Sequence, residues 1–139
     1  MSTEKNIAAQ KKFGAAINSG NLEALEDLVS SNVKDHDPAD GQTAGAQGYI
    51  NFFTLMRTAF PDLKIEPIHM VSDDHNVAFA YDISGTHEGE FMDIKPTGKK
   101  IKVRGMQISR FEDGLMVERW GSSDELGILK QLGVNMLEE

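Results

Sequence analysis

The hydrophobic positions along this chain change period once, close to Pro61. Before Pro61, apolar residues recur every three or four positions, a spacing typical of amphipathic helices. After it, apolar and polar residues alternate, which is typical of strands with one covered face. The pattern predicts helices at 3–18, 22–29 and 45–59, a short extended segment at 32–37, and strands at 63–66, 77–84, 101–111 and 115–121.

Turn and cap signals fix the order of these elements. Asp113-Gly114 predicts a tight hairpin, and Pro67 marks a sheet edge or a bulge. Asp124 is placed to cap a last helix, which Gly133 would end. Helices followed by an antiparallel meander predict one α+β domain over residues 1–139, with the helices covering one face of the sheet.

The connection over residues 85–100 is too long for an ordinary hairpin turn. Loops of this size are usually functional, and Phe91 and Ile94 give it apolar side chains that could fold over a cavity. The alternative is a long hairpin that only packs on its own sheet.

One face of the 101–111 strand predicts an internal pocket. Ile101 and Phe111 are apolar at its ends, whereas Gly105, Gln107 and Ser109 are small or polar in the middle. A solid core would favour branched aliphatic residues there, so a ligand cavity with hydrogen-bonding groups is expected. Alternatively, Gln107 and Ser109 satisfy each other or a buried water.

The other face of this strand predicts a homodimer. Met106 and Ile108 share it with Lys102, Arg104 and Arg110. Two apolar side chains among charges on an outer sheet face suggest contact with a second copy, although isolated apolar surface residues are also normal.

Composition excludes several classes of function. The 139 residues carry a net charge of −8, which argues against binding nucleic acid. There is no cysteine and no apolar run long enough to span a membrane, and the first residues lack a signal-peptide pattern, so we expect a cytoplasmic protein. His69 and His75 flank an acidic turn, but their spacing matches no known metal motif, and we expect no metal site.

Short motifs spread over nearly the whole chain resemble the SnoaL-like polyketide cyclases, within the group that shares the nuclear-transport-factor-2 (NTF2) fold. The motifs are Val33-Lys34-Asp35-His36-Asp37-Pro38, Phe60-Pro61-Asp62-Leu63, Gly85-Thr86-His87-Glu88-Gly89-Glu90-Phe91, Pro96-Thr97-Gly98, Asp113-Gly114, Val117-Glu118-Arg119-Trp120, Asp124-Glu125-Leu126-Gly127 and Gln131-Leu132-Gly133. The resemblance implies a curved antiparallel sheet that the N-terminal helices close into a cone around a ligand pocket.

The resemblance also implies a reaction mechanism, but this chain has different residues at the two positions that the mechanism uses. Characterised cyclases of the family close a ring by intramolecular aldol condensation, without metal or organic cofactor, using an aspartate and a histidine. Aligned through Asp113-Gly114, the histidine position falls on Gln107 and the aspartate position on Gly121. Neither replacement exchanges a proton near neutral pH, although Gln107 could still polarise a carbonyl oxygen.

Three ionisable residues remain as candidate catalytic groups: His36, His87 and Asp124. Each also has a structural alternative, respectively a half-exposed turn residue, a histidine bonded to the backbone, and a helix cap. The expected ligand-binding residues on the pocket walls are Phe13, Phe53, Met56, Tyr81, Gln107 and Trp120.

We therefore expect a cofactor-independent acid/base enzyme, cyclase-, isomerase- or hydroxylase-like, acting on a small cyclic or polyketide-like carbonyl compound. The missing aspartate and histidine keep two alternatives open. One is a non-catalytic protein that binds a small molecule in the same pocket, and the other is an interaction domain that uses its outer sheet face.

Overall fold

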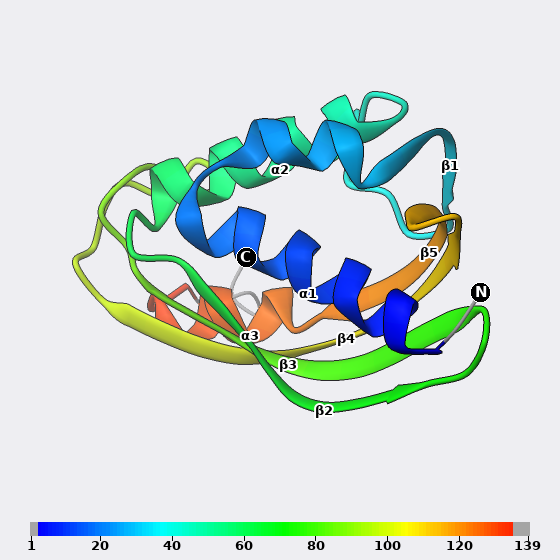
Figure 1. Cartoon of the computed structure of the whole chain (residues 1–139). Helices are drawn as coiled ribbons and strands as arrows, with labels where there is room; N and C mark the ends of the chain where they lie inside the picture. The colour runs from blue at the N-terminus through cyan, green and yellow to red at the C-terminus, as the bar shows by residue number, and fades with distance from the viewer. Residues whose placement is uncertain (1–2, 135–139) are drawn as a thin grey trace.

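A computed structural model describes residues 3–134 of the chain (Figure 1). Along the chain the elements are α1 (Thr3–Ser19), the 3-10 helix η1 (Leu22–Asp27), β1 (Val29–Asp35), α2 (Ala46–Ala59), β2 (Lys64–Ser72), β3 (Asn76–Thr86), β4 (Lys100–Glu112), β5 (Leu115–Ser123) and α3 (Glu125–Gln131). The predicted change from helices to strands is confirmed, except that the second helix is shorter and β1 begins at Val29.

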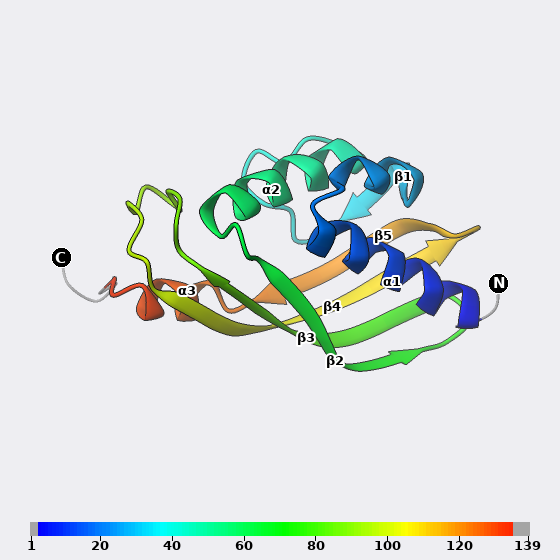
Figure 2. The same cartoon turned by 60° about the vertical axis from the view of Figure 1, so that its left-hand side comes forward.

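The strands form one sheet in the order β1-β5-β4-β3-β2. Successive strands from β2 to β5 pair antiparallel, as the alternating pattern predicts, whereas β1 lies parallel to β5. The sheet is curved and unclosed, and α1 and α2 lie across its concave side (Figures 1 and 2). The α+β class and the cone of helices and sheet are therefore confirmed.

Most turn and cap predictions are also met. Asp113 and Gly114 both have positive φ, +51° and +79°, as a tight hairpin turn of this kind requires. Pro67 lies on the edge strand β2, where the register shifts between Pro67 and His69. Asp124 caps α3 by accepting a hydrogen bond of 2.8 Å from the Gly127 backbone N–H.

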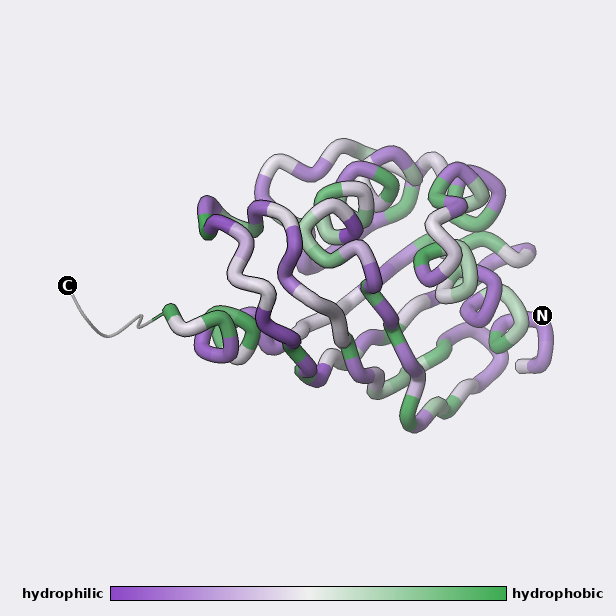
Figure 3. The backbone as a smooth tube through the Cα atoms, turned by 90° about the vertical axis from the view of Figure 1, so that its left-hand side faces the viewer, coloured by the Kyte–Doolittle hydropathy of each residue, from purple (hydrophilic) through white to green (hydrophobic). Residues whose placement is uncertain are grey.

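The inner face of the sheet forms the core with the helices. Strand burial alternates strictly along β3 and most of β4, so every second side chain faces α1 and α2. Hydrophobic and hydrophilic positions are interspersed along the same strands and helices in Figure 3. The largest fully buried side chains at one end of this core are Phe111, Met116, Leu25 and Val77.

A bulge in β5 decides which of its residues face inward. Phe111 pairs with Met116, but Arg110, one residue earlier, pairs with Glu118, so Val117 is an extra residue. Such an insertion shifts the alternation by one position from there on. As a result Arg119 pairs with the inward-facing Ser109, and Trp120 pairs with Ile108 on the outer face.

The long connection between β3 and β4 folds against the end of α2. Backbone N–H groups of Glu88 and Gly89 donate to the Ala59 carbonyl, both at 3.0 Å. The Phe91 ring packs on Phe60, with centroids 5.3 Å apart. The connection therefore packs on α2 as well as on its own sheet.

Within residues 3–134, none of the helices combines the length and apolar character needed to cross a membrane.

Candidate functional site

An ion pair joins two neighbouring strands on the inner face. Asp35 ends β1 and pairs in register with Arg119 of β5. Arg119 Nη1 donates to both carboxylate oxygens of Asp35, at 3.1 and 3.2 Å. The Tyr49 hydroxyl of α2 donates to the same carboxylate at 2.8 Å, and the Asp37 backbone N–H does so at 2.9 Å. Gln42 Nε2 adds a longer hydrogen bond of 3.4 Å, so four residues bond this carboxylate.

These contacts keep Asp35 ionised. Burial alone would raise the pKa of Asp35, but the Arg119 charge and the hydrogen bonds from Asp37, Tyr49 and Gln42 outweigh it and lower the pKa below its ordinary value. Burial, together with the neighbouring Asp35 carboxylate, raises the pKa of Tyr49. Burial also raises the pKa of Tyr81, against the opposing charge and hydrogen bond of Arg119. The ion pair is thus fixed in its charged form near neutral pH, with both phenols neutral.

A chain of side-chain hydrogen bonds extends from this pair into β4. Arg119 Nε donates to Gln107 Oε1 at 2.8 Å, and Gln107 Nε2 donates to Ser109 Oγ at 2.8 Å. Gln107 is 8% exposed and Ser109 fully buried. The alternative, that these two polar residues satisfy each other, is therefore confirmed, and Arg119 completes the arrangement; the expected ligand cavity stays a prediction. We call Asp35, Tyr49, Tyr81, Gln107, Ser109 and Arg119 the inner polar cluster.

Two glycines make room for this cluster. Gly121 pairs with Gln107, so the two positions at which the family has its aspartate and histidine are direct neighbours here. A Cβ at position 121 would overlap Nη2 of Arg119 and lie 2.7 Å from its Cζ. A Cβ at Gly105 would lie 2.6 Å from the Tyr81 hydroxyl. The guanidinium therefore occupies the space that a side chain at position 121 would need.

The inward-facing side chains differ slightly in how completely they are buried. At one end Val77, Ser109 and Met116 are fully buried. In the middle of the sheet, several inward-facing side chains are buried but keep 6–9% exposure. They are Phe79, Tyr81, Ile83, Val103 and Gln107. The least tightly buried part of the inner face is thus next to the inner polar cluster.

Four of the six expected wall residues, Phe13, Met56, Tyr81 and Gln107, are buried, and their role as pocket walls stays a prediction. Phe13 of α1 and Tyr49 of α2 meet edge to face, with ring centroids 5.9 Å apart. Met56, Tyr81 and Gln107 are buried on the inner side. Phe53 is half-buried on α2 and packs edge to face on Phe52 at 5.0 Å.

The expectation that Trp120 lies on the wall of an inner pocket is wrong. It lies on the outer face and is 37% exposed, because the bulge at Val117 reverses the direction of the residues after it. Its ring stacks on His36, with centroids 4.5 Å apart and planes at 4°. His36 Nε2 lies 2.6 Å from a Glu118 carboxylate oxygen. His36 therefore sits outside the cone, away from the inner polar cluster.

His87 is fully buried at the base of the 87–99 connection. The Thr97 backbone N–H donates to its Nδ1 at 3.1 Å, so the neutral ring carries its proton on Nε2. Nε2 is a buried atom without a hydrogen-bond partner among the described residues. Asp124, the third candidate, is exposed and occupied as the cap of α3. The structure thus does not bring His36, His87 and Asp124 together.

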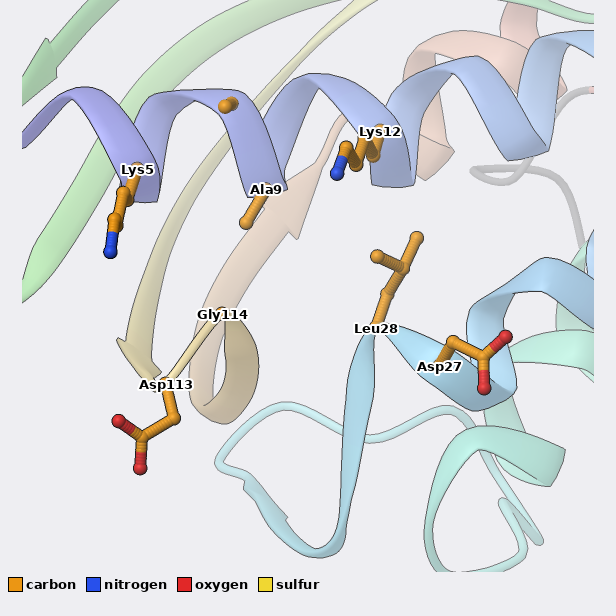
Figure 4. A pocket seen from close by; sticks show the side chains of 8 residues that line it. Lys5, Ala9, Lys12, Asp27, Leu28, Asp113 and Gly114 are labelled. Atoms are coloured by element: carbon orange, nitrogen blue, oxygen red, sulfur yellow. The ribbon is translucent and has the colours of Figure 1, made fainter.

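Two shallow hollows lie on the surface. One, of ≈ 480 Å³, lies between α1, the start of β1 and the hairpin turn; Leu28 points toward α1 beside Ala9 and Lys12 (Figure 4). The other, of ≈ 440 Å³, lies over the outer sheet face beside Met106, Ile108 and Trp120.

In the part of the chain that the structure describes, no three His, Asp or Glu side chains gather as a metal site would require.

The sequence missed Asp35, Tyr49 and Arg119 as members of the site. Asp35 and Arg119 each lie inside one of the family motifs, but alternation along β5 points to Trp120 as the inward residue. The parallel pairing of β1 with β5 brings the two motifs together, and an alternating pattern carries no information about such a pairing.

Comparison with known proteins identifies a family for this chain and solved structures with a similar fold. The family model described as SnoaL-like polyketide cyclase matches residues 7–132. IdmH from Streptomyces antibioticus, described as a candidate polyketide cyclase, is 30% identical, with a TM-score of 0.82 over 93% of this chain and 99% of that one. AclR from Streptomyces galilaeus, described as a candidate hydroxylase, is 25% identical, with a TM-score of 0.85 over 99% of this chain and 87% of that one. No curated protein matches the sequence.

Proposed function

The chain belongs to the SnoaL-like polyketide cyclase family, and on that premise we propose that it is a cofactor-independent enzyme acting on a small cyclic or polyketide-like carbonyl compound inside the cone. In this proposal Gln107 and Arg119 orient the ligand and stabilise negative charge on its carbonyl oxygen. The half-buried Phe53 and the buried Met56 and Phe13 contact its apolar part.

The observation that carries this proposal is the inner polar cluster. A network of charged and amide groups, preorganised by short hydrogen bonds, lies beside inward-facing side chains that keep a small exposure. Donors that are already oriented stabilise an oxyanion or enolate without reorganising during the reaction, which is often the largest single contribution to catalysis.

We do not propose a standard aldol cyclase. Gly121 and Gln107 stand where the family has its acid/base residues, and the Arg119 side chain fills the space beside Gly121. A general acid or base typically contributes about 10²–10⁴-fold, so its loss should leave an anthracycline-type ester precursor essentially unconverted. Hydroxylase- or isomerase-like chemistry remains compatible with the site, and AclR illustrates that relatives with another described activity share this fold.

A specific observation also favours a second candidate, a non-catalytic protein that binds the same class of ligand. The three ionisable candidates lie apart: His36 is on the outer face, His87 under the long connection and Asp124 at a helix cap. Asp35, Tyr49 and Tyr81 in the inner polar cluster each keep one protonation state near neutral pH, and such a site binds a carbonyl compound without exchanging protons with it.

Deuterium exchange separates the two. We would incubate the protein with 1-tetralone in D₂O at neutral pH and follow the α-protons by NMR. An enzyme of the proposed kind accelerates exchange by stabilising the enolate while solvent removes the α-proton, and Gln107→Leu slows the accelerated rate about 10²-fold. Saturable binding without accelerated exchange would establish the binding protein instead, and neither binding nor exchange would refute both. Gly14→Ala is the matched control, because a Cβ at Gly14 meets open space.

A further inference from the structure

Within the inner polar cluster, the acceptor atoms are occupied by hydrogen bonds from neighbouring residues, whereas several donor N–H and O–H groups are not used in these bonds. Both oxygens of Asp35, Oε1 of Gln107 and Oγ of Ser109 each accept at least one hydrogen bond from a neighbouring residue. The guanidinium of Arg119 carries five N–H donors, and its bonds to Gln107 and Asp35 are made through Nε and Nη1. Arg119 also hydrogen-bonds to Tyr81, which takes one further N–H. The donors left over are the remaining N–H of Nη2, the second amide hydrogen of Gln107 and the Ser109 hydroxyl hydrogen.

The accessible side of the ion pair is the positive one. The side chain of Arg119 is 19% exposed, whereas that of Asp35 is 6% exposed and lies behind it. The carboxylate fixes the guanidinium in place, and Gly121 lets Nη2 lie over the backbone where other residues would place a side chain. The space where a side chain at position 121 would start thus holds part of a positive group, while the Asp37 carboxylate accepts a hydrogen bond of 2.9 Å from the Gly121 backbone N–H.

From this we infer that Arg119 is a specificity-determining residue, and that its Nη2 edge beside Gly121 receives an anionic oxygen of the ligand, a carboxylate or an enolate. The inference rests on the proposed ligand site inside the cone and names the class of ligand for it. A planar apolar compound with one acidic oxygen matches the donors of the cluster and the aromatic residues of α1 and α2.

Calorimetry with three probes tests it: 2-naphthoate as a carboxylate, the enolate of 2-phenyl-1,3-indandione, and 2-naphthamide as the neutral match of the first. We expect at least one anion to bind about ten- to a hundredfold more tightly than the amide, since a hydrogen bond to a charged group contributes about 1.5–3 kcal/mol. Which anion binds more tightly identifies the acidic group. In ¹⁵N-labelled protein, the Nε–H signal of Arg119 should shift on titration with that anion.

Two variants separate Arg119 from the rest of the site. Gly121→Ala keeps every polar group but forces Arg119 from its position, and should reduce the anion-to-amide ratio of affinities to about one. Arg119→Met combined with Asp35→Asn removes both charges together, so no buried charge is left uncompensated, and should have the same effect. Gly14→Ala, which also adds one methyl group, should keep the ratio of the unmodified protein.

The alternatives are distinguishable. Equal binding of anion and amide, with signals of Gln107 and Tyr81 shifting for both, would overturn the role of Arg119 and leave the proposed ligand site standing. An anion preference that survives Gly121→Ala and the double substitution would likewise overturn it. If no probe binds, or if none shifts an inner-face signal, the inference falls together with the proposed function.

Discussion

The Asp35 carboxylate and the Arg119 guanidinium meet at 3.1 and 3.2 Å although 84 residues separate them in the sequence. Their strands, β1 and β5, run parallel, and the two residues are register partners. Because Tyr49, Gln107 and Gly121 are all arranged around this pair, it is the structural centre of the proposed site, and the first two predictions concern it.

Removing one partner of the Asp35–Arg119 ion pair should lower the free energy of unfolding. Arg119→Met leaves the Asp35 carboxylate in a poorly solvated position, and we expect a loss of about 3 kcal/mol, the lower end for a buried pair. Adding Asp35→Asn should restore most of it, since no uncompensated charge remains. Urea denaturation measures both, and equal stabilities of the single and double variants would contradict the prediction.

Acid should weaken the fold partly through Asp35. Its pKa is lowered in the folded protein, so it adds stability above its ordinary value of 3.8, and this contribution is lost as the pH falls through the lower folded value. Asp35→Asn should therefore be less stable than the unmodified protein near neutral pH, and the difference should shrink progressively below pH 3.8. Thermal unfolding across this range tests it; a constant difference would exclude the linkage.

We predict a homodimer through the outer sheet face. Met106 is 62% exposed, Ile108 43% and Trp120 37%, and the last two pair across β4 and β5. A charge in the middle of such a face disfavours its burial, so Ile108→Lys should give a monomer. Light scattering measures the mass. Leu55→Glu, at a residue 71% exposed on α2, is the control that should stay dimeric. A monomer mass at every concentration of the unmodified protein would refute the prediction.

His87 should hold the long connection in place. Its Nδ1 accepts from the Thr97 N–H at 3.1 Å, and its own backbone N–H and C=O bond to Lys99 and Gly98, both at 2.8 Å. His87→Ala leaves a backbone donor unsatisfied and should cost about 1–3 kcal/mol. Hydrogen exchange of amides 88–98 should become faster, and unchanged protection there would show that the ring does not anchor the connection.

Asp124 should be structural. Asparagine accepts the same hydrogen bond from Gly127, so Asp124→Asn should preserve stability, whereas Asp124→Ala should cost about 1 kcal/mol. Neither should change the exchange of 1-tetralone protons. A folded Asp124→Asn protein with lost activity would make Asp124 a catalytic residue.

The sequence by itself determined the architecture. The change of period at Pro61, the Asp113-Gly114 turn and the Asp124 cap depend on interactions between residues close in the chain, which local spacing and residue type report directly. The alternation of β3 and β4 also identified the correct inner face, including Gln107 and Ser109, because these two strands pair without any register shift.

Only the tertiary structure decided which groups meet inside that face. One extra residue in β5, Val117, turns Trp120 outward and Arg119 inward, and an alternating pattern does not reveal where such a residue is absorbed. The parallel pairing of β1 with β5 then places Asp35 beside Arg119. The site forms between segments that are distant in sequence. Which of their side chains meet depends on strand register, and the register is set by the whole sheet and not by any single segment.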